Sequence, residues 1–518
     1  MNLESILGKF LTRGLFFRIM YKKFRIIRLQ INNHDYLNTI NLQFQNEINN
    51  SNVVEPFTNL IIGANGTGKS QILRIIADIF RELEYQKYRE KKLKIKRLNY
   101  VLEYQINNSV FRVESKGKSK KDIFKNNQHS DIFHLILPER LIVSSFMLND
   151  KFLFIDNSKK QTKKIFYEYG GIRSTSTTSR TRTYLKRIIE NIVESSTDLR
   201  FLDNLEFILE FLELKPFFNI FFHPRFRPYF FKGEISSEEF TSFFKDWKKH
   251  RPNRKTEPYS IPYFNKLNKK EIKKLVSFIN RSQKKITKED RSYWFEYNIL
   301  TKKISDNTQL IEDFKCIKKL MKLDLLSYPG IEVQKLDEKF NLSESSSGEY
   351  HFISTIVGIL AKIKDNSLVL IDEPEISLHP NWQIRYVNYL KKIFANYPSC
   401  QFIIATHSHF MVSDLKKESS SIISLKKEEN GGIKAYTHPE NTYGWSTEDI
   451  LLNIFEVTTV RNYYLADKIG NILTLISDKD QNINEIKTKV RELKKIKTQL
   501  KEIDPLKEIM DKLFKKFG

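Results

Sequence analysis

The chain has 518 residues, of which 40% are hydrophobic and 29% are charged, a composition typical of globular domains that excludes an intrinsically disordered chain. At roughly 100–200 residues per domain, this length allows about two to four domains. With 87 Lys and Arg against 62 Asp and Glu, the formal net charge is +25. That excess of positive charge favours a nucleic-acid partner, because Lys and Arg displace the counterions condensed on nucleic acid. A codon bias towards Lys would also produce part of the excess.

The amino-terminal residues and the cysteines indicate the compartment. Residues 1–24 predict an amphipathic helix, because basic residues interrupt the apolar run that a secretory signal requires. No segment reaches the roughly 18 consecutive apolar residues of a membrane span. Cys316 and Cys400 are too few for a disulfide framework, which fits a reducing compartment. We therefore expect a cytoplasmic protein without a membrane partner.

Three strands and a helix are predicted in the first part of the chain. Apolar residues run or alternate at 24–31, 39–44 and 59–64, as they do in strands, and they repeat at helical spacing at 69–83. Further strands are expected at 98–106, 109–115 and 139–145, the first two joined by an Asn-Asn-Ser turn.

The segment between the strand at 59–64 and the helix at 69–83 reads GANGTGKS and matches G-x-x-x-x-G-K-[ST] without a gap. Its glycines let backbone N–H groups close around phosphates at a helix N-terminus. The lysine would reach the terminal phosphates, and the serine would give a hydroxyl to Mg²⁺. We therefore expect ATP and Mg²⁺ as cofactors, held by Asn65, Gly66, Gly68, Lys69 and Ser70.

From about residue 155 to 330 the pattern changes to helix-like runs and Lys- and Arg-rich stretches, which predicts an inserted, mainly helical domain. Its tract 246–297 interleaves basic residues with aromatic ones. Cations that neutralise phosphates and aromatic rings that stack on exposed bases would together line a nucleic-acid channel. Charged helix faces with a buried aromatic side produce the same string, so both interpretations stay open.

A serine-rich stretch at 341–360 precedes helix-like spacing of apolar residues. Serine hydroxyls and a glycine backbone at a helix start form an anion site, and the chain already has one at Lys69. Two phosphate sites in one chain suggest that one serves a neighbour's nucleotide. A serine-rich linker before a capped helix would give the same sequence.

Two later strands, at 367–371 and 401–405, each end in polar residues. The first delivers Asp372 and Glu373. Asp372 would hold Mg²⁺ through its water shell, and Glu373 would act as general base or polarise the attacking water. The second strand leads to His407.

The tail from about residue 480 predicts a charged helix that ends at Pro505. Its apolar residues at near-heptad spacing are Ile486, Val490, Leu493 and Leu500. This stripe would either bind a partner or pack on the rest of the chain.

Five stretches together resemble the ATP-binding-cassette ATPase head: GANGTGKS, SSSGEY, LVLIDEPE, SLHP and IIATHS, in the order phosphate loop, signature, metal strand, D-loop and switch histidine. The resemblance implies an α/β P-loop NTPase with a mixed sheet flanked by helices. It also implies a head-to-tail homodimer that closes ATP between one chain's phosphate loop and the other's signature. On this basis Ser346 and Gly348 contact the γ-phosphate in trans, and His407 contacts it in cis as a second catalytic residue beside Glu373.

The chain departs from that pattern in two places. Ser347 replaces the usual first signature glycine. No glutamine ends the strand at 139–145, where the cassette has its metal-contacting residue, and Gln105 lies in the predicted hairpin instead. The Q-loop residue is therefore not assigned.

The stretch between Ser70 and Asp372 is too long for a transporter head, and it lacks the sustained heptads of chromosome-maintenance ATPases. It therefore requires a short insertion. We expect the first half of the ATPase head at 1–153, an inserted, mainly helical basic domain at 154–334, the second half of the head at 335–425, and a C-terminal helical region at 426–518.

DEPEISLHP with ATHS resembles the ATPases of phage-defence systems, including the overcoming-lysogenisation-defect, Septu and retron-associated groups. The stretches 138–152, 167–176 and 443–457 are similar to the Septu-type subunit. The resemblance implies a cytoplasmic ATPase that forms a homodimer or a higher oligomer. It also implies that this ATPase regulates a separate HNH-type effector nuclease in anti-phage defence. A gap-repair-type DNA repair ATPase is the alternative, and a transporter subunit is disfavoured by the insertion.

The lysogenisation-defect proteins carry their own nuclease domain, which needs acidic residues on separate strands to hold metals. Asp478 and Asp480 follow an apolar run here, but too few residues come after them for such a domain. We expect no nuclease activity in this chain.

Overall fold

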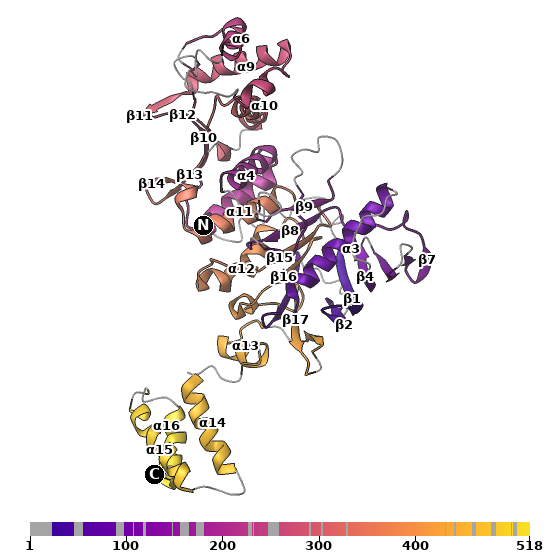
Figure 1. Cartoon of the computed structure of the whole chain (residues 1–518), viewed down its shortest axis with the longest axis vertical. Coiled ribbons are helices and arrows are strands. Elements are labelled where there is room, and N and C mark those ends of the chain that lie inside the picture. The colour runs from indigo at the N-terminus through magenta and orange to yellow at the C-terminus, as the bar shows by residue number, and fades with distance from the viewer. Residues whose placement is uncertain are drawn as a thin grey trace, which may run out of the picture. The chain divides into compact units, whose positions relative to one another are not determined.

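The first unit of the chain is built around a seven-stranded sheet in the order β18-β17-β3-β16-β15-β8-β9 (Figure 1). All neighbouring strands are parallel except β17 and β18, which form an antiparallel hairpin at one edge. Every residue of β8, β15 and β16 is buried, as expected for parallel strands that are covered on both faces. The strands are β3 (Phe57–Gly63), β8 (Leu141–Ser145), β9 (Tyr167–Tyr169), β15 (Leu368–Asp372), β16 (Gln401–Ala405), β17 (Ser420–Lys427) and β18 (Ile433–His438).

The structure is a computed structural model of the chain, and it divides into two units, Met1–Gly444 and Trp445–Gly518. Residues 1–22 of the expected N-terminal helix, Asp478 and Asp480 lie outside the described residues. The described residues are 23–45, 55–89, 98–106, 108–117, 121–147, 149–155, 165–171, 173, 181–225, 230–231, 233–246, 258–289, 292–301, 304–327, 330–429, 431–439, 442–457, 463–477, 483–498, 500 and 505–517.

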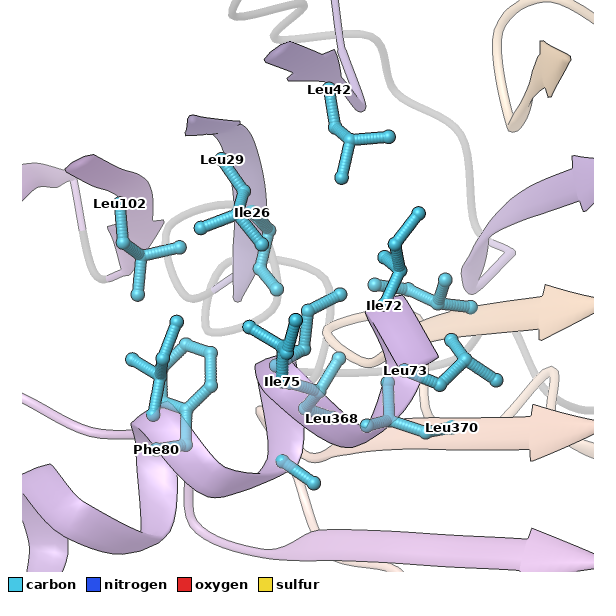
Figure 2. Close-up of a cluster of buried hydrophobic side chains, with 14 of the residues drawn as sticks. Ile26, Leu29, Leu42, Ile72, Leu73, Ile75, Phe80, Leu102, Leu368 and Leu370 are labelled. Atoms are coloured by element: carbon cyan, nitrogen blue, oxygen red, sulfur yellow. The ribbon is translucent and has the colours of Figure 1, made fainter. Parts of the chain in front are cut away.

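A second sheet, antiparallel and six-stranded, covers helix α3 (Lys69–Arg89) from the side away from β15. Figure 2 shows Ile72, Leu73, Ile75 and Phe80 of α3 between leucines of β15 and apolar side chains of this second sheet. The helix therefore has one apolar stripe for each sheet. The sheet has the order β2-β1-β4-β5-β6-β7, with β1 (Arg25–His34), β2 (Asn38–Gln43), β4 (Asn99–Ile106), β5 (Ser109–Lys116), β6 (Asp122–Lys125) and β7 (Gln128–Ser130).

The α/β P-loop fold predicted from the sequence is confirmed, with two differences of extent. The head sheet includes β9, beyond residue 153, and the β17–β18 hairpin, which reaches past residue 425. The helical region expected from residue 426 therefore begins with a strand pair. Ile433 is the only large aliphatic residue of β18, so the strand carries little apolar signal in the sequence.

The inserted region contains more than helices. Five antiparallel strands form a sheet in the order β11-β12-β10-β13-β14, and its last strand ends beyond the expected boundary at residue 334. Phe295 of β12, in the basic tract, packs inside this lobe and is fully buried against Phe222 and Phe278. The elements are α4 (Thr181–Ser195), α5 (Leu199–Phe211), β10 (Phe218–Phe222), α6 (Ser237–Lys245), α8 (Ser260–Phe264), α9 (Lys269–Ser282), β11 (Thr287–Glu289), β12 (Ser292–Asn298), α10 (Ile304–Lys322), β13 (Gly330–Lys335) and β14 (Glu338–Asn341).

Helices α4 and α5 join the insertion to the head by packing on α11 (Ser347–Leu360) and α12 (Pro380–Ile393). The ring of Phe211 on α5 lies 4.8 Å from that of Phe352 on α11 and 3.9 Å from that of Tyr389 on α12. The Ser195 hydroxyl lies 3.4 Å from the Ala361 carbonyl, to which it donates. The insertion and the helix that follows the serine-rich stretch therefore share one packed interface.

The second unit is helical and has its own apolar core. Ile486, Val490 and Leu493 are fully buried against the neighbouring helices of this unit, so the near-heptad stripe is already covered. Pro505 begins a further helix, as the first-turn preference of proline allows. The helices are α13 (Thr447–Asn453), α14 (Tyr463–Ser477), α15 (Ile483–Lys497) and α16 (Pro505–Phe517).

Among the described residues, no helix combines the length and the apolar composition that crossing a bilayer requires.

Replacing Leu370 by alanine should lower the free energy of unfolding by about 2–5 kcal/mol, because the cavity left between α3 and β15 cannot refill. Chemical denaturation of the full chain measures the loss. Leu336→Ala is the control: Leu370 is fully buried, whereas Leu336 is 78% exposed in the same unit. The control should change the free energy by less than about 0.5 kcal/mol. Equal losses in both variants would contradict the role given to the α3 core.

Candidate nucleotide site

The carboxyl ends of four parallel strands meet at one edge of the head sheet, where ligands bind in open α/β sheets. In the strand register, Asp372 at the end of β15 lies beside Ala405 of β16 and Ser145 of β8. Ala405 in turn lies beside Ile61 of β3. The phosphate loop, the acidic pair and the switch histidine therefore emerge from neighbouring strands, although they are far apart in the chain.

The phosphate loop requires its glycines. Gly63 and Gly68 have φ angles of +149° and +86°, which side chains on L residues rarely tolerate. A Cβ on Gly63 would lie 2.6 Å from the Leu425 carbonyl oxygen, and one on Gly68 would lie 2.5 Å from Leu37. The loop therefore keeps its backbone close to β17 and to the β1–β2 turn.

Lys69 lies within the phosphate loop and is 3% exposed. Its Nζ donates to the Gly63 carbonyl at 2.9 Å and lies 3.1 Å from His407 Nδ1. Burial lowers the pKa of Lys69 to about 8, and Glu373 and its acidic neighbours oppose that shift. A cation held inside a glycine-rich loop at a helix start is suited to an anion such as a phosphate.

Ser70 and Asp372 form the second part of the site. The Ser70 hydroxyl donates to Asp372 Oδ1 at 3.0 Å. Burial raises the pKa of Asp372 to about 7, against the effect of the Ser70 hydrogen bond. Mg²⁺ prefers oxygen ligands and takes one or two from protein, with the rest from water and phosphate. The chemistry of this hydroxyl and carboxylate pair fits that ion.

Glu373 and His407 form the third part. Glu373 Oε1 lies 3.3 Å from His407 Nε2, and this hydrogen bond is the main reason that the pKa of Glu373 is lowered. Glu373 has a left-handed φ of +50°, and its backbone N–H donates to the Ala405 carbonyl at 2.9 Å. The carboxylate is thus ionised near neutral pH and held at the end of β15, as a general base must be.

The serine-rich stretch is a helix start. Ser346 caps α11: its hydroxyl accepts from the Glu349 N–H at 3.2 Å, and Glu349 Oε2 accepts from the Ser346 N–H at 3.0 Å. Gly348 is buried, and a Cβ there would lie 2.4 Å from the Ser377 carbonyl oxygen in the D-loop. The described contacts of these two residues are therefore with α11 and the D-loop, and their role in another chain's site stays a prediction.

Two further residues lie beside the phosphate loop and were not predicted from the sequence. Tyr36, in the β1–β2 turn, donates a hydrogen bond to the Gly66 carbonyl, and its side chain is about half exposed. The Lys427 ammonium, at the end of β17, would lie 3.5 Å from a Cβ on Gly66. Both belong to hairpins whose tips reach the loop only in the folded chain, so no local motif marks them.

A buried ion pair lies beyond the end of β8. Asp150 accepts from Arg173 Nε at 2.8 Å, from Arg173 Nη2 at 2.7 Å and from the Tyr169 hydroxyl at 2.6 Å. The Arg173 carbonyl accepts from Arg187 Nη2 of α4 at 2.5 Å. This cluster, here called the β8 cluster (Asp150, Tyr169, Arg173 and Arg187), ties the end of β8 to the insertion.

A protein-family model described as "AAA domain, putative AbiEii toxin, Type IV TA system" matches residues 58–413. Two similar curated proteins are the Septu protein PtuA of Bacillus thuringiensis, 27% identical over 124 residues, and the Retron Ec83 probable ATPase of Escherichia coli, 32% identical over 136 residues. These matches cover 23% and 24% of this chain, and 30% and 23% of the respective relatives. The chain therefore aligns with less than a third of either relative.

Solved structures with likeness to the chain include an Smc head domain derived from Pyrococcus furiosus, at 13% identity and a TM-score of 0.33, covering 84% of this chain and 100% of that one. Another is the recombination mediator protein RecF, at 14% identity and a TM-score of 0.28, covering 80% of this chain and 99% of that one. Scores this low add nothing to the fold, which rests on the sheet order and the family match.

Asp150→Ala should lower the free energy of unfolding by about 3–5 kcal/mol, because it leaves the Arg173 guanidinium buried without its carboxylate. The double variant with Arg173→Met should recover part of that loss, since no buried charge remains. Denaturation of the two single variants and the double variant gives the coupling energy.

The control for this cycle is Asp337→Ala, whose carboxylate is 98% exposed and pairs with Lys215. Its loss should stay below about 1 kcal/mol. A double variant whose loss equals the sum of the two single losses would show that Asp150 and Arg173 are not coupled.

Proposed function

The chain belongs to the AAA domain family, whose model matches residues 58–413. From this premise we propose that it is a Mg²⁺-dependent ATPase. The proposed ATPase dimerises around ATP and regulates a partner effector nuclease in anti-phage defence. One observation supports it most: Lys69, His407 and Glu373 form a connected chain of side chains beside the Ser70–Asp372 pair. The side chains proposed to bind phosphate, to hold a metal and to activate water thus lie at one sheet edge.

The proposed chemistry follows from these contacts. Asn65, Gly66 and Gly68 present backbone N–H groups to the phosphates, and Lys69 neutralises the terminal ones. Ser70 and Asp372 would hold Mg²⁺, which would supply further positive charge to the leaving phosphates. Glu373 accepts the proton of the attacking water or orients that water, because its ionised carboxylate is the required form. His407 holds Glu373 through Nε2 and faces Lys69 through Nδ1.

The proposed dimer is head to tail. The exposed Ser346 at the start of α11 and the neighbouring Gly348 would complete the nucleotide site of a second copy. The resemblance of SSSGEY to the cassette signature supports this role, and the capping box fixes the position of the helix start. The packing of α4 and α5 on α11 would carry dimer closure to the insertion.

The proposed partners rest on sequence likeness and on charge. Local likeness to the Septu and retron ATPases supports a defence role, a separate HNH-type nuclease and a cytoplasmic site of action. The net charge of +25 supports nucleic acid as a further ligand. Affinity purification of the full chain from its own host tests the partner: recovery of a nuclease supports defence, and recovery of replication or repair proteins supports the gap-repair alternative.

Glu373→Gln should trap the chain as an ATP-bound dimer, because the amide keeps the shape of the side chain and cannot accept the water's proton. We expect turnover to fall by about 10²–10⁴-fold and dimers to accumulate with ATP and Mg²⁺. Light scattering after size exclusion and a phosphate-release assay measure both. Glu338→Gln is the control, because Glu338 is exposed at the start of β14. Unchanged turnover in Glu373→Gln would remove Glu373 from its role.

A mixing experiment tests the composite site. Lys69→Ala chains keep the signature, and Ser346→Arg chains keep the phosphate loop, so each variant alone should be inactive. Their mixture forms dimers with one intact site and should regain ATP turnover. Ser343→Arg, on a neighbouring exposed serine, is the control and should remain active alone. Mixed dimers that form and stay inactive would contradict a site shared between two chains.

A further inference from the structure

Helix α9 of the insertion carries a one-sided set of cations, here called the lysine face. Lys270, Lys273 and Ser277 share one side of α9 at helical spacing, and Lys266 lies in the turn before the helix and Lys284 in the 3-10 turn Gln283–Lys285 after it. All four lysines are exposed. Among the residues that the structure describes, no carboxylate pairs with any of these four lysines. Their charge is therefore left for an external partner.

The carboxylates near α9 are already engaged with other cations. Glu271 belongs to the helix cap and pairs with Lys319 of α10 at 2.6 Å. Asp313, which is almost fully buried, accepts from Arg281. Lys315 and, to a smaller extent, Lys274 lower the pKa of the exposed Glu312. These pairs lie along the side of α9 that meets α10, so the opposite side keeps its positive potential.

The apolar side of α9 is not available to a membrane. Leu275, Val276, Phe278 and Ile279 are buried in the lobe, and the Phe278 ring lies 6.2 Å from that of Phe295 on β12. A helix that binds a bilayer inserts its apolar side among the lipids. Here that side is part of a protein core, and the lysine face carries no large apolar residue.

We propose that the lysine face binds the phosphate backbone of a nucleic-acid duplex. Helix α9 has 14 residues and is therefore about 21 Å long. A duplex segment of that length carries roughly a dozen phosphate charges. Lysine ammonium groups act as point charges on phosphates and do not read base edges, so the contact is independent of sequence.

This inference deepens the nucleic-acid part of the proposed function, and it removes the buried rings from the predicted channel of stacked aromatics, of which Tyr259 is 62% exposed. Phe264 and Phe295 of the basic tract are buried, and Phe244 stacks on Phe264 at 4.6 Å. Rings committed to a core cannot stack on bases. The electrostatic half of the original hypothesis remains, on the surface of α9.

The test compares the wild-type chain with a triple variant, Lys270→Gln/Lys273→Gln/Lys284→Gln. The probes are a 30-base-pair DNA duplex, an RNA duplex of the same sequence and phosphatidylserine vesicles, over a range of salt concentrations. Each lost phosphate contact lowers the slope of log K against log salt by about 0.9 on DNA. We expect the slope to fall by roughly 2–3 and affinity to fall at least about tenfold, with no vesicle binding.

The control removes the same charge elsewhere: Lys364→Gln/Lys392→Gln/Lys417→Gln, all exposed on the head. It should bind nucleic acid like the wild type. ATP turnover, measured on every variant, should be unchanged, so loss of binding is separated from loss of the ATPase. The DNA and RNA probes decide which duplex is preferred.

Three outcomes would overturn the proposal. The wild type could bind neither duplex, the control could lose as much affinity as the α9 variant, or the α9 variant could keep its affinity and salt slope. Binding to vesicles without binding to either duplex would assign the surface to a membrane instead.

Discussion

The position of α3 between two sheets is the constraint on which the nucleotide site depends. Its apolar residues pack on β15 from one side and on the antiparallel sheet from the other, so the helix cannot shift without opening both cores. Its first residues are Lys69 and Ser70. The packing of the helix thus fixes the phosphate loop against the end of β15, where Asp372 accepts from Ser70.

Burying so many charges at one edge is costly, and their mutual contacts offset the cost. Desolvation lowers the pKa of Lys69 and raises that of Asp372, and each is opposed by a neighbour in the site. Glu373 is the exception, because its hydrogen bond with His407 outweighs its partial burial. Separate environments thus shift the pKa values of two adjacent carboxylates in opposite directions, and a Mg²⁺ ion beside Asp372 would favour the ionised form of that carboxylate.

The sequence predicted the parts of the fold that local patterns determine. The buried strands, α3 and the order of the site residues follow from apolar runs and from one ungapped motif, and the structure brings Lys69, Ser70, Asp372, Glu373 and His407 together. The insertion's sheet was missed because its short aromatic strands resemble a nucleic-acid tract. The β8 cluster was missed for another reason: Asp150 and Arg173 recognise each other across the fold, and no spacing rule joins them.

The end of β8 is linked to α11 by two routes, one of which passes through the insertion. On one route Arg187 of α4 holds the loop of Arg173 beside β8, and α4 packs on α11. On the other, Phe146 at the end of β8 packs edge-on against His351 of α11, with ring centroids 5.7 Å apart. A displacement of the β8 end would therefore reach α11 from both sides. Because α11 begins at the residues expected to serve a second chain's ATP, the proposed dimer contact and the insertion are mechanically joined.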